Sequence, residues 1–212
     1  GSMLKSVAVK VGGAARVVAG RQLAPSLTQR VNPYALSGLR PMSYTPRREW
    51  AVYLSGEIHS DWREQIAEGV QNRALPVSLS SPNTVHEDSD DCGALILGDE
   101  QTRQNYDNKG ARMNSIRTKT LLEEADIVVV RFGDKYKQWN AAFEAGYASA
   151  LNKPLIILHP PDVEHALKEV NAFASVVCHD PQAVVETLDY TINGKLPKAP
   201  KDFVPMVERL KK

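Results

Sequence analysis

Asp126-Ile-Val-Val-Val-Arg-Phe132 is the stretch of this 212-residue sequence that best indicates its fold. Its run of consecutive apolar residues is typical of a strand buried on both faces at the centre of a parallel sheet. Pro154-Leu-Ile-Ile-Leu-His159 has the same character and predicts a second buried strand. Outward from these two stretches, short β-rich runs alternate with segments of helical periodicity. We expect further strands at 50–55, 77–80 and 174–178, and helices at 61–73, 112–124, 139–151, 162–169 and 181–191.

Strands that alternate with helices are joined by right-handed crossovers into a parallel sheet. The predicted fold is therefore α/β and Rossmann-like (flavodoxin-like), a doubly wound sheet of five parallel strands. The polar segment 81–110 is long for a connection in such a domain, so it is either functional or carries a short helix of its own. No G-x-G-x-x-G pattern follows the first strand, and no P-loop is present, so we predict no nucleotide cofactor.

The charge is distributed unevenly along the chain. Residues 1–48 carry eight basic side chains and no acidic one, which leaves a net charge of −7 from Glu49 onward. Gly1-Ser2 before Met3 is typical of a cloning scar, and the basic, hydroxyl-containing residues after it are typical of an organelle transit peptide. We expect targeting to the mitochondrial matrix. A plastid location is the alternative if residues 1–48 target an organelle. If they are a basic tail without a targeting role, a cytoplasmic location is expected.

The expected organisation is a leader at 1–48, one domain at 49–193 and a C-terminal tail at 194–212. An acidic body lacks the clustered Lys and Arg side chains that neutralise phosphates, so we predict no nucleic-acid partner. No run of eighteen apolar residues exists, so we predict no membrane span. Cys92 and Cys178 fit unpaired thiols in a reducing compartment.

In an open α/β sheet, ligands bind beyond the carboxyl ends of the strands. That rule selects four groups of residues, and it adds the first turns of the helix expected from Arg112, which include Asn114 and Arg117. Asp126 opens its strand at the opposite edge and is expected to be structural. The four groups are Ser55–His59, 81–110, 131–140 and 159–161.

Glu144 is the one acidic residue in the otherwise apolar segment Trp139–Tyr147. Its early position in the expected helix, near the positive end of the helix dipole, favours an ionised carboxylate. Such a carboxylate in a partly dry cleft can attack the anomeric carbon of a sugar. The alternative is a solvated glutamate on the outer face of the helix.

Several short motifs occur in an order and spacing that resemble the nucleoside 2-deoxyribosyltransferase superfamily, and most closely its YtoQ family. Tyr53-Leu-Ser-Gly-Glu-Ile58 resembles the Y-x-x-G-x-I signature at the first strand. Phe143-Glu-Ala-Gly-Tyr147 resembles the helix that carries the nucleophile, and Lys153-Pro-Leu-Ile-Ile157 resembles the strand after it. The YtoQ resemblance also covers His59-Ser-Asp-Trp62 and Arg131 to Asn140.

The resemblance implies that Glu144 attacks C1′ of a nucleoside, expels the base and holds a covalent glycosyl intermediate. A second base or water then takes the sugar. Tyr53 would orient the nucleophile or the sugar, and Trp139, Tyr136 or Trp62 could stack on a base, although we expect Trp62 in the core. A homodimer or larger homo-oligomer is also implied. The expected substrate-binding residues are Ser55, Gly56, Glu57, His59, Asn114, Arg117, Arg131, Gln138, Trp139 and Asn140.

The chain departs from the family pattern at the acids that hold the leaving base. Thr118 and Gln138 stand where family transferases have aspartates, so the general acid must come from elsewhere. The candidates are Glu87, Asp88, Asp90 and Asp91, in a run that could equally be a solvated loop. A catalytically silent nucleoside- or nucleotide-binding module is therefore the rival prediction, and an interaction scaffold without a small ligand is the third.

Two further departures concern phosphate and metal. Glu57 and His59 replace the Ser and Arg that grip phosphate in related hydrolases, so a neutral nucleoside-like ligand is expected, although Arg131 or Lys135 could still hold a phosphate. His86 lies beside several acidic residues but has no second histidine at ligand spacing, so we predict no metal.

Overall fold

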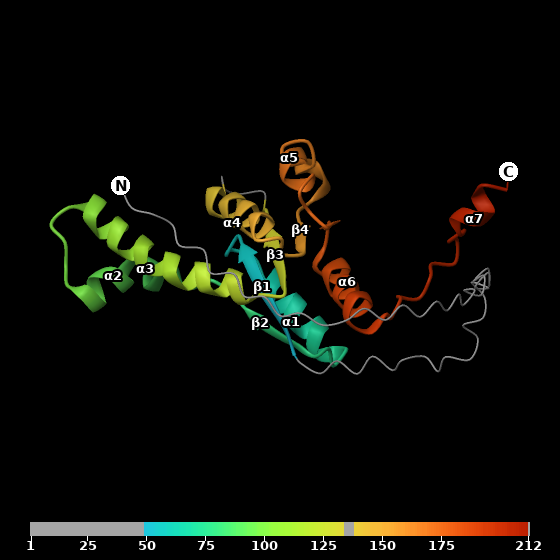
Figure 1. Ribbon diagram of the computed structural model, residues 1–212, viewed down its shortest axis with the longest axis horizontal. Helices are drawn as coiled ribbons and strands as arrows, with labels where there is room; N and C mark the ends of the chain where they lie inside the picture. The colour runs from blue at the N-terminus through green and yellow to red at the C-terminus, as the bar shows by residue number, and fades with distance from the viewer. Residues whose placement is uncertain (1–48, 134–137, 212) are drawn as a thin grey trace, which may run out of the picture. The chain divides into compact units, whose positions relative to one another are not determined.

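Five parallel strands form one sheet in the order β2-β1-β3-β4-β5, the flavodoxin-like order. The computed structural model describes residues 49–133 and 138–211. The strands are β1 Trp50–Gly56, β2 Val77–Ser80, β3 Ile127–Arg131, β4 Leu155–Leu158 and β5 Val176–Cys178 (Figure 1). The predicted doubly wound sheet is thereby confirmed. The expected leader at 1–48, together with Lys135 and Tyr136, lies outside the described residues.

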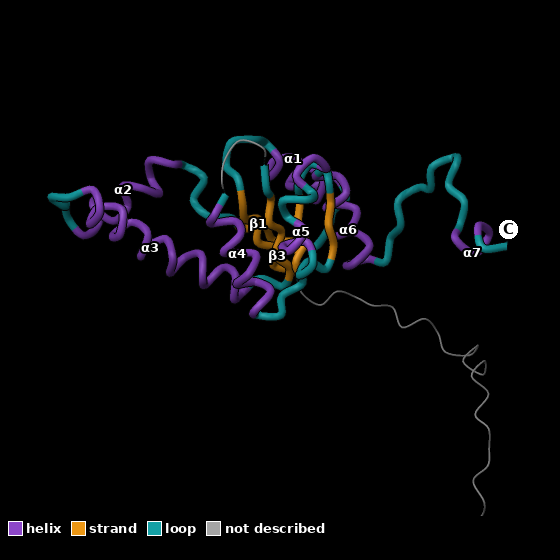
Figure 2. Tube along the Cα trace, turned by 90° about the horizontal axis from the view of Figure 1, so that it is seen from above, coloured by secondary structure: helices purple, strands orange, loops and turns teal. Residues whose placement is uncertain are grey.

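Helices cover both faces of the sheet, with α4 and α6 on opposite sides of the strands in Figure 2. One face packs against α1 and α6, and the other packs against α4 and the end of α3, with α5 beside α4. The helices of the domain are α1 Trp62–Asn72, α2 His86–Leu97, α3 Arg103–Glu124, α4 Trp139–Ala150, the 3-10 turn η1 Pro161–Val163, α5 Lys168–Asn171 and α6 Pro181–Asn193. A short helix, α7 Met206–Arg209, follows in the C-terminal tail.

The strand alternation of β1 divides its side chains between two apolar layers. Val52 and Leu54 point into the layer under α1 and α6, where Trp62 is buried as expected. Tyr53 points the other way, into the layer under α4. Because the side-chain period of a strand is two, Ser55 also faces α4.

The polar segment 81–110 carries a helix of its own, α2, which was one of the two alternatives predicted for it. Two predicted helices differ from the structure. The helix expected from Arg112 begins at Arg103. Thr102 caps that helix, since its hydroxyl accepts a hydrogen bond from the Asn105 backbone N–H at 3.3 Å. The helix expected at 162–169 is replaced by η1 and the short α5.

A pair of glycines explains why the sequence pattern did not reveal the bounds of α2 and the start of α3. A Cβ on Gly93 would lie 2.6 Å from the Gly110 backbone nitrogen, so the two helices cross at backbone contact. Their contact is made by small and polar residues, whereas a helix is recognised in sequence by a periodic apolar stripe. Without that stripe, the segment has the sequence character of a polar loop.

Asp126 has the structural role expected for it. Its carboxylate accepts a hydrogen bond from the Ala51 backbone N–H at 3.0 Å, and its own N–H donates to the Ala51 carbonyl at 2.7 Å. These bonds tie the start of β3 to β1 at the edge of the sheet away from the predicted ligand site.

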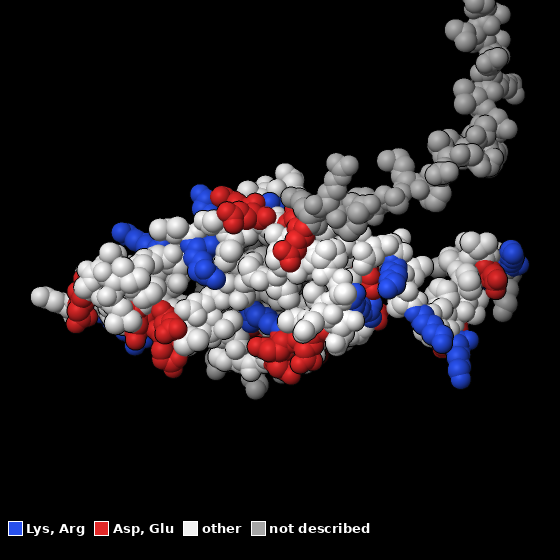
Figure 3. Space-filling view, turned by 90° about the horizontal axis from the view of Figure 1, so that it is seen from below, with Lys and Arg blue, Asp and Glu red and all other residues white. Residues whose placement is uncertain are grey.

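Two predictions concern a membrane span and a nucleic-acid partner. None of the helices in the described ranges combines the length and apolarity that crossing a membrane requires. On the face in Figure 3, Lys and Arg side chains are interspersed with Asp and Glu side chains. The prediction that the protein binds no nucleic acid stays a prediction.

Candidate active site

The carboxylate of Glu144, on α4, is held against the end of β1. Its Oε2 accepts hydrogen bonds from the Tyr53 phenol, at 3.3 Å, and from the Ser55 hydroxyl. Both donors come from β1 and lie two residues apart, so their side chains point to the same face of the sheet. Within the described residues Oε1 accepts no hydrogen bond. One carboxylate oxygen is therefore positioned and the other is available.

Burial sets the charge state of this site. Glu144 is only 8% exposed, and burial raises the pKa of its carboxyl, against the hydrogen bonds from Ser55 and Tyr53 and the positive charge of Arg63. The expectation that the helix dipole would favour ionisation is wrong in direction. Glu144 is the sixth residue of α4, and the dipole acts mainly within the first turn.

Tyr53 is held as a neutral donor. It is fully buried, and burial raises the pKa of its phenol, as does the negative charge of Glu144. The Thr118 side chain acts in the opposite direction and lowers the pKa of this phenol. Thr118, which stands where the family resemblance implies an aspartate, therefore lies beside Tyr53.

Arg63 is a buried cation that the sequence did not single out. Its guanidinium donates to three backbone carbonyls at the end of β1 and just after it: Nε to Leu54 at 3.1 Å, Nη1 to Glu57 at 2.7 Å and Nη2 to Gly56 at 3.0 Å. The side chain also lies over the Trp62 ring, with its Cζ 4.4 Å from the ring centroid. Arg63 therefore holds in place the turn at the end of β1. In the sequence, Arg63 is marked only by its position beside the apolar face of a predicted helix.

Gly56 permits that turn. Its φ of +113° is rarely adopted by residues with a side chain, and a Cβ there would lie 2.1 Å from the Arg131 carbonyl oxygen. The glycine lets β1 and β3 approach closely at the edge where the ligand is expected.

A cavity of about 540 Å³ opens in front of Glu144. It lies between the end of β1, the start of α4 and the paired helices α2 and α3. Its volume is within the range of small-molecule sites. Five of the predicted binding residues line it together with Glu144: Ser55, Gly56, Asn114, Arg117 and Asn140.

A second cavity of about 260 Å³ shares Gly56 and Asn140 with the first, so the two adjoin. The predicted residues Glu57, His59, Gln138 and Trp139 line it. Trp139 is 73% exposed, and Phe143, on the rim of the larger cavity, is 70% exposed. These aromatic faces are accessible, whereas Trp62 is in the core.

Arg131 lines neither cavity, which corrects its expected role in binding substrate. Its Nε lies 3.0 Å from Glu57 Oε1, in an ion pair that is largely buried. Burial would raise the pKa of Glu57, but hydrogen bonds from the Ser60 hydroxyl, the His59 backbone N–H and Arg131 outweigh it and lower the pKa. The two charges therefore satisfy each other, and Arg131 is not free to hold a phosphate.

The α2–α3 pair supplies the polar wall of the larger cavity. Asn114 donates from Nδ2 to the Ser89 carbonyl at 2.8 Å, and Arg117 donates to the Ser81 carbonyl at 3.3 Å. Of the four acids weighed as proton donors, only Asp90 lines the cavity, where it pairs with His86 at 3.5 Å. Asp91 instead accepts a hydrogen bond from Tyr106.

Asp107, on α3, also lines this cavity and had not been weighed as a proton donor. No signal in sequence marked it, because the start of α3 was taken for loop. A carboxyl group facing the cavity from each of α2 and α3 is thus available to a ligand.

Gln138 is hydrogen-bonded within the connection between β3 and α4. Its side-chain oxygen accepts from the Gly133 backbone N–H at 2.9 Å. Its amide nitrogen is buried and has no hydrogen-bond partner among the residues that the structure describes. Within the described residues, the side chains that could share a metal ion lie elsewhere, at the ends of β4 and β5.

The fold is that of a nucleoside 2-deoxyribosyltransferase-like domain. The model of the family described as nucleoside 2-deoxyribosyltransferase YtoQ matches residues 53–192, and the chain belongs to this family. It is 41% identical over 142 residues to the uncharacterized protein YtoQ of Bacillus subtilis (strain 168), an overlap that covers 67% of this chain and 96% of that protein.

Two solved structures align with this chain at low sequence identity. A 2-deoxyribosyltransferase from Bacillus psychrosaccharolyticus aligns with a TM-score of 0.41 and 17% identity, over 65% of this chain and 95% of that one. A conserved protein from Enterococcus faecalis V583 aligns with a TM-score of 0.48 and 12% identity, over 67% and 98% of the two chains.

Proposed function

We propose that this protein cleaves the N-glycosidic bond of a nucleoside or a related N-riboside, with Glu144 as the nucleophile. The observation that carries the proposal is the buried carboxylate whose Oε2 is held by Ser55 and Tyr53 and which faces a cavity of ligand size. Family membership supports the choice of substrate class.

In the proposed reaction, Oε1 of Glu144 attacks C1′ and the electron pair of the C–N bond leaves with the base. A glutamyl-glycosyl ester forms, and a second base or water then attacks C1′ to release the sugar from Glu144. The hydrogen bonds to Oε2 orient the carboxylate before attack, which is an entropic contribution to the rate. They also stabilise the carboxylate when it leaves in the second step.

The leaving base requires a proton, and we propose that it comes from the α2 wall. Asp90 lines the cavity, and its Oδ2 lies 3.5 Å from Nε2 of His86, so an acid–base pair stands in this wall. General acid catalysis of this kind contributes about 10²–10⁴-fold. Replacement of Asp90 by Asn should lower turnover of nucleosides with poor leaving groups far more than turnover of a nucleoside with an activated leaving group. Equal losses on the two would contradict the assignment.

The test of the proposal compares the wild type with Glu144→Gln across nucleosides, nucleotides and related N-ribosides. Thermal stabilisation reports binding by mass action, and free-base release reports turnover. Glu144→Gln should bind the substrate and release no base, and the quenched wild-type reaction should show one glycosyl adduct by intact mass. Glu68→Gln, on the exposed face of α1, is the matched control and should keep full turnover. Undiminished release by Glu144→Gln would overturn the proposal.

A catalytically silent binding module is the second candidate, favoured by a specific observation. Thr118 and Gln138 stand where the family resemblance implies acids; Gln138 is hydrogen-bonded to the Gly133 backbone N–H, and Thr118 lies beside Tyr53. In that case the wild type and Glu144→Gln would both be stabilised by the same ligand, and neither would release base.

We also propose that the protein associates into a homodimer or larger homo-oligomer. Large apolar side chains are exposed on α2 and beside the cavity, including Leu95, Ile96, Phe143 and Trp139. Analytical ultracentrifugation should give a mass of at least two chains, and a monomer at micromolar concentration would contradict this. Import into the mitochondrial matrix stays a prediction, tested by whether residues 1–48 direct a fluorescent reporter there.

A further inference from the structure

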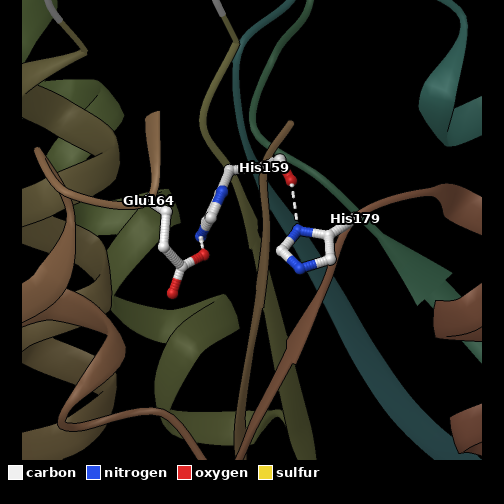
Figure 4. Close-up of side chains that lie close together, drawn as sticks. All are labelled: His159, Glu164 and His179. Atoms are coloured by element: carbon white, nitrogen blue, oxygen red, sulfur yellow. Dashed lines mark hydrogen bonds and ion pairs between the residues drawn. The ribbon is translucent and has the colours of Figure 1, made fainter. Parts of the chain in front are cut away.

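Two histidines and a glutamate meet at the carboxyl ends of β4 and β5, outside the cavities of the proposed active site (Figure 4). The register pairs Leu158 with Cys178, so the next residues on each strand, His159 and His179, are neighbours. Glu164 approaches from the segment after η1. Each of the three residues offers a potential ligand atom within 4.8 Å of those of the other two. His159 and His179 are twenty residues apart in sequence, which is why no spacing motif revealed them.

Both histidines have their tautomer fixed by a backbone carbonyl. Nδ1 of His159 lies 2.8 Å from the Pro160 oxygen, and Nδ1 of His179 lies 3.1 Å from the His159 oxygen (Figure 4). A carbonyl can only accept, so each Nδ1 must donate a proton, and each Nε2 of a neutral ring keeps its lone pair. An Nδ1–H donated to a carbonyl is the usual outer-shell support of a metal-binding histidine.

Asn171, on α5, stands where a fourth ligand would. Its Nδ2 lies 3.0 Å from His159 Nε2 and 3.2 Å from Glu164 Oε1, while its Oδ1 is buried and has no hydrogen-bond partner in the described part of the chain. A half-turn of the amide exchanges the two atoms and presents the oxygen to the same neighbours. Glu164 Oε2 lies 3.5 Å from His159 Nε2. Atoms at the corners of a tetrahedron around zinc, with bonds of about 2.0–2.1 Å, are roughly 3.3 Å apart.

We propose that His159, Glu164 and His179 bind a zinc ion, with the Asn171 side-chain oxygen as the fourth ligand. Imidazole and carboxylate donors suit this ion, and the set contains no thiolate that would demand a softer one. His159 is fully buried whereas Glu164 and His179 are exposed, so the ion enters from solvent onto a rigid first ligand. The ion would join the segment 160–171 to the end of the sheet, which is a structural role.

The test uses the full-length protein without a polyhistidine tag, stripped with a chelator and titrated with zinc chloride by calorimetry. One equivalent should bind, and the melting temperature should rise until that equivalent is reached. His179→Ala and Glu164→Gln change exposed side chains and should each weaken binding at least tenfold. His165→Ala alters a neighbouring exposed histidine outside the cluster and should leave the affinity unchanged.

The outcomes separate a built site from adventitious binding. Cobalt(II) in place of zinc should give the strong visible absorption of a tetrahedral ion, and that absorption should be lost in His179→Ala. Absence of stoichiometric zinc binding by the wild type would overturn the proposal. So would an affinity that His179→Ala and Glu164→Gln leave unchanged.

Discussion

Replacement of Glu144 by Gln should stabilise the protein near neutral pH. The native carboxyl is almost fully buried, and its raised pKa means that the folded state holds the proton more tightly than the unfolded chain does. Stability then falls as pH rises from the unfolded value, about 4.3, through the higher folded value. Glutamine keeps an oxygen that can accept from Tyr53 and Ser55, and it removes the ionisation.

The magnitude follows from linkage. Each unit by which the pKa is raised corresponds to about 1.4 kcal/mol of stability lost above the folded pKa. In a domain of this size each kilocalorie per mole changes the melting temperature by about 2–4 °C. We therefore expect Glu144→Gln to melt above the wild type at pH 7.5, by an amount that measures the shift in pKa, and this advantage should shrink toward pH 4, where both side chains are neutral.

Urea denaturation and thermal melting between pH 4 and pH 8 measure this difference directly. Glu68→Gln removes an exposed carboxylate from α1 and should show a smaller effect with no comparable dependence on pH. If Glu144→Gln were less stable than the wild type at pH 7.5, or if the difference were constant with pH, the raised pKa would be wrong. The assay needs no substrate, so it tests the site independently of the proposed reaction.

Three further substitutions test how the site is built. Gly56→Ala should lower the free energy of unfolding by more than about 1 kcal/mol, measured in urea, because of its positive φ and the approach of the Arg131 carbonyl. Arg63→Met keeps the apolar stem but removes three hydrogen bonds to backbone carbonyls, and should destabilise by about 1–3 kcal/mol in the same assay, whereas a neutral result would contradict the carbonyl contacts. Gly93→Val should separate α2 from α3 and lower the affinity of any cavity ligand in calorimetry, with the β-sheet signal in circular dichroism unchanged.

The sheet could be predicted from sequence because its signals are local. The apolar run of β3 and the alternation of β1 each reflect burial on known faces, and together they placed Tyr53, Ser55 and Glu144 at one edge. The α2–α3 wall could not be predicted, since its packing rests on the Gly93–Gly110 contact and on polar side chains.

Electrostatic interactions between residues far apart in the sequence could not be predicted from sequence patterns either. The ion pair that withdraws Arg131 from the site joins positions 74 residues apart. Arg63 acts on backbone carbonyls, which have no sequence signature. The pKa of Glu144 was misjudged for a related reason: position in a helix is visible in sequence, whereas burial against another strand is a tertiary property that dominates it.

Glu57 and Glu144 show how the same side-chain chemistry is divided between two roles. Glu57 is paired with Arg131, and its pKa is lowered, so it stays ionised and fixes the turn after β1. Glu144 forms no ion pair within residues 49–133 and 138–211, and the nearby Arg63 donates its hydrogen bonds to backbone carbonyls. A buried carboxylate without a partnered cation destabilises the fold, so its presence here is better explained by the proposed reaction than by stability. Titratable groups whose environments move their pKa values apart mark acid–base and nucleophilic roles, and by that criterion Glu144 fits the proposed nucleophile and Glu57 a structural role.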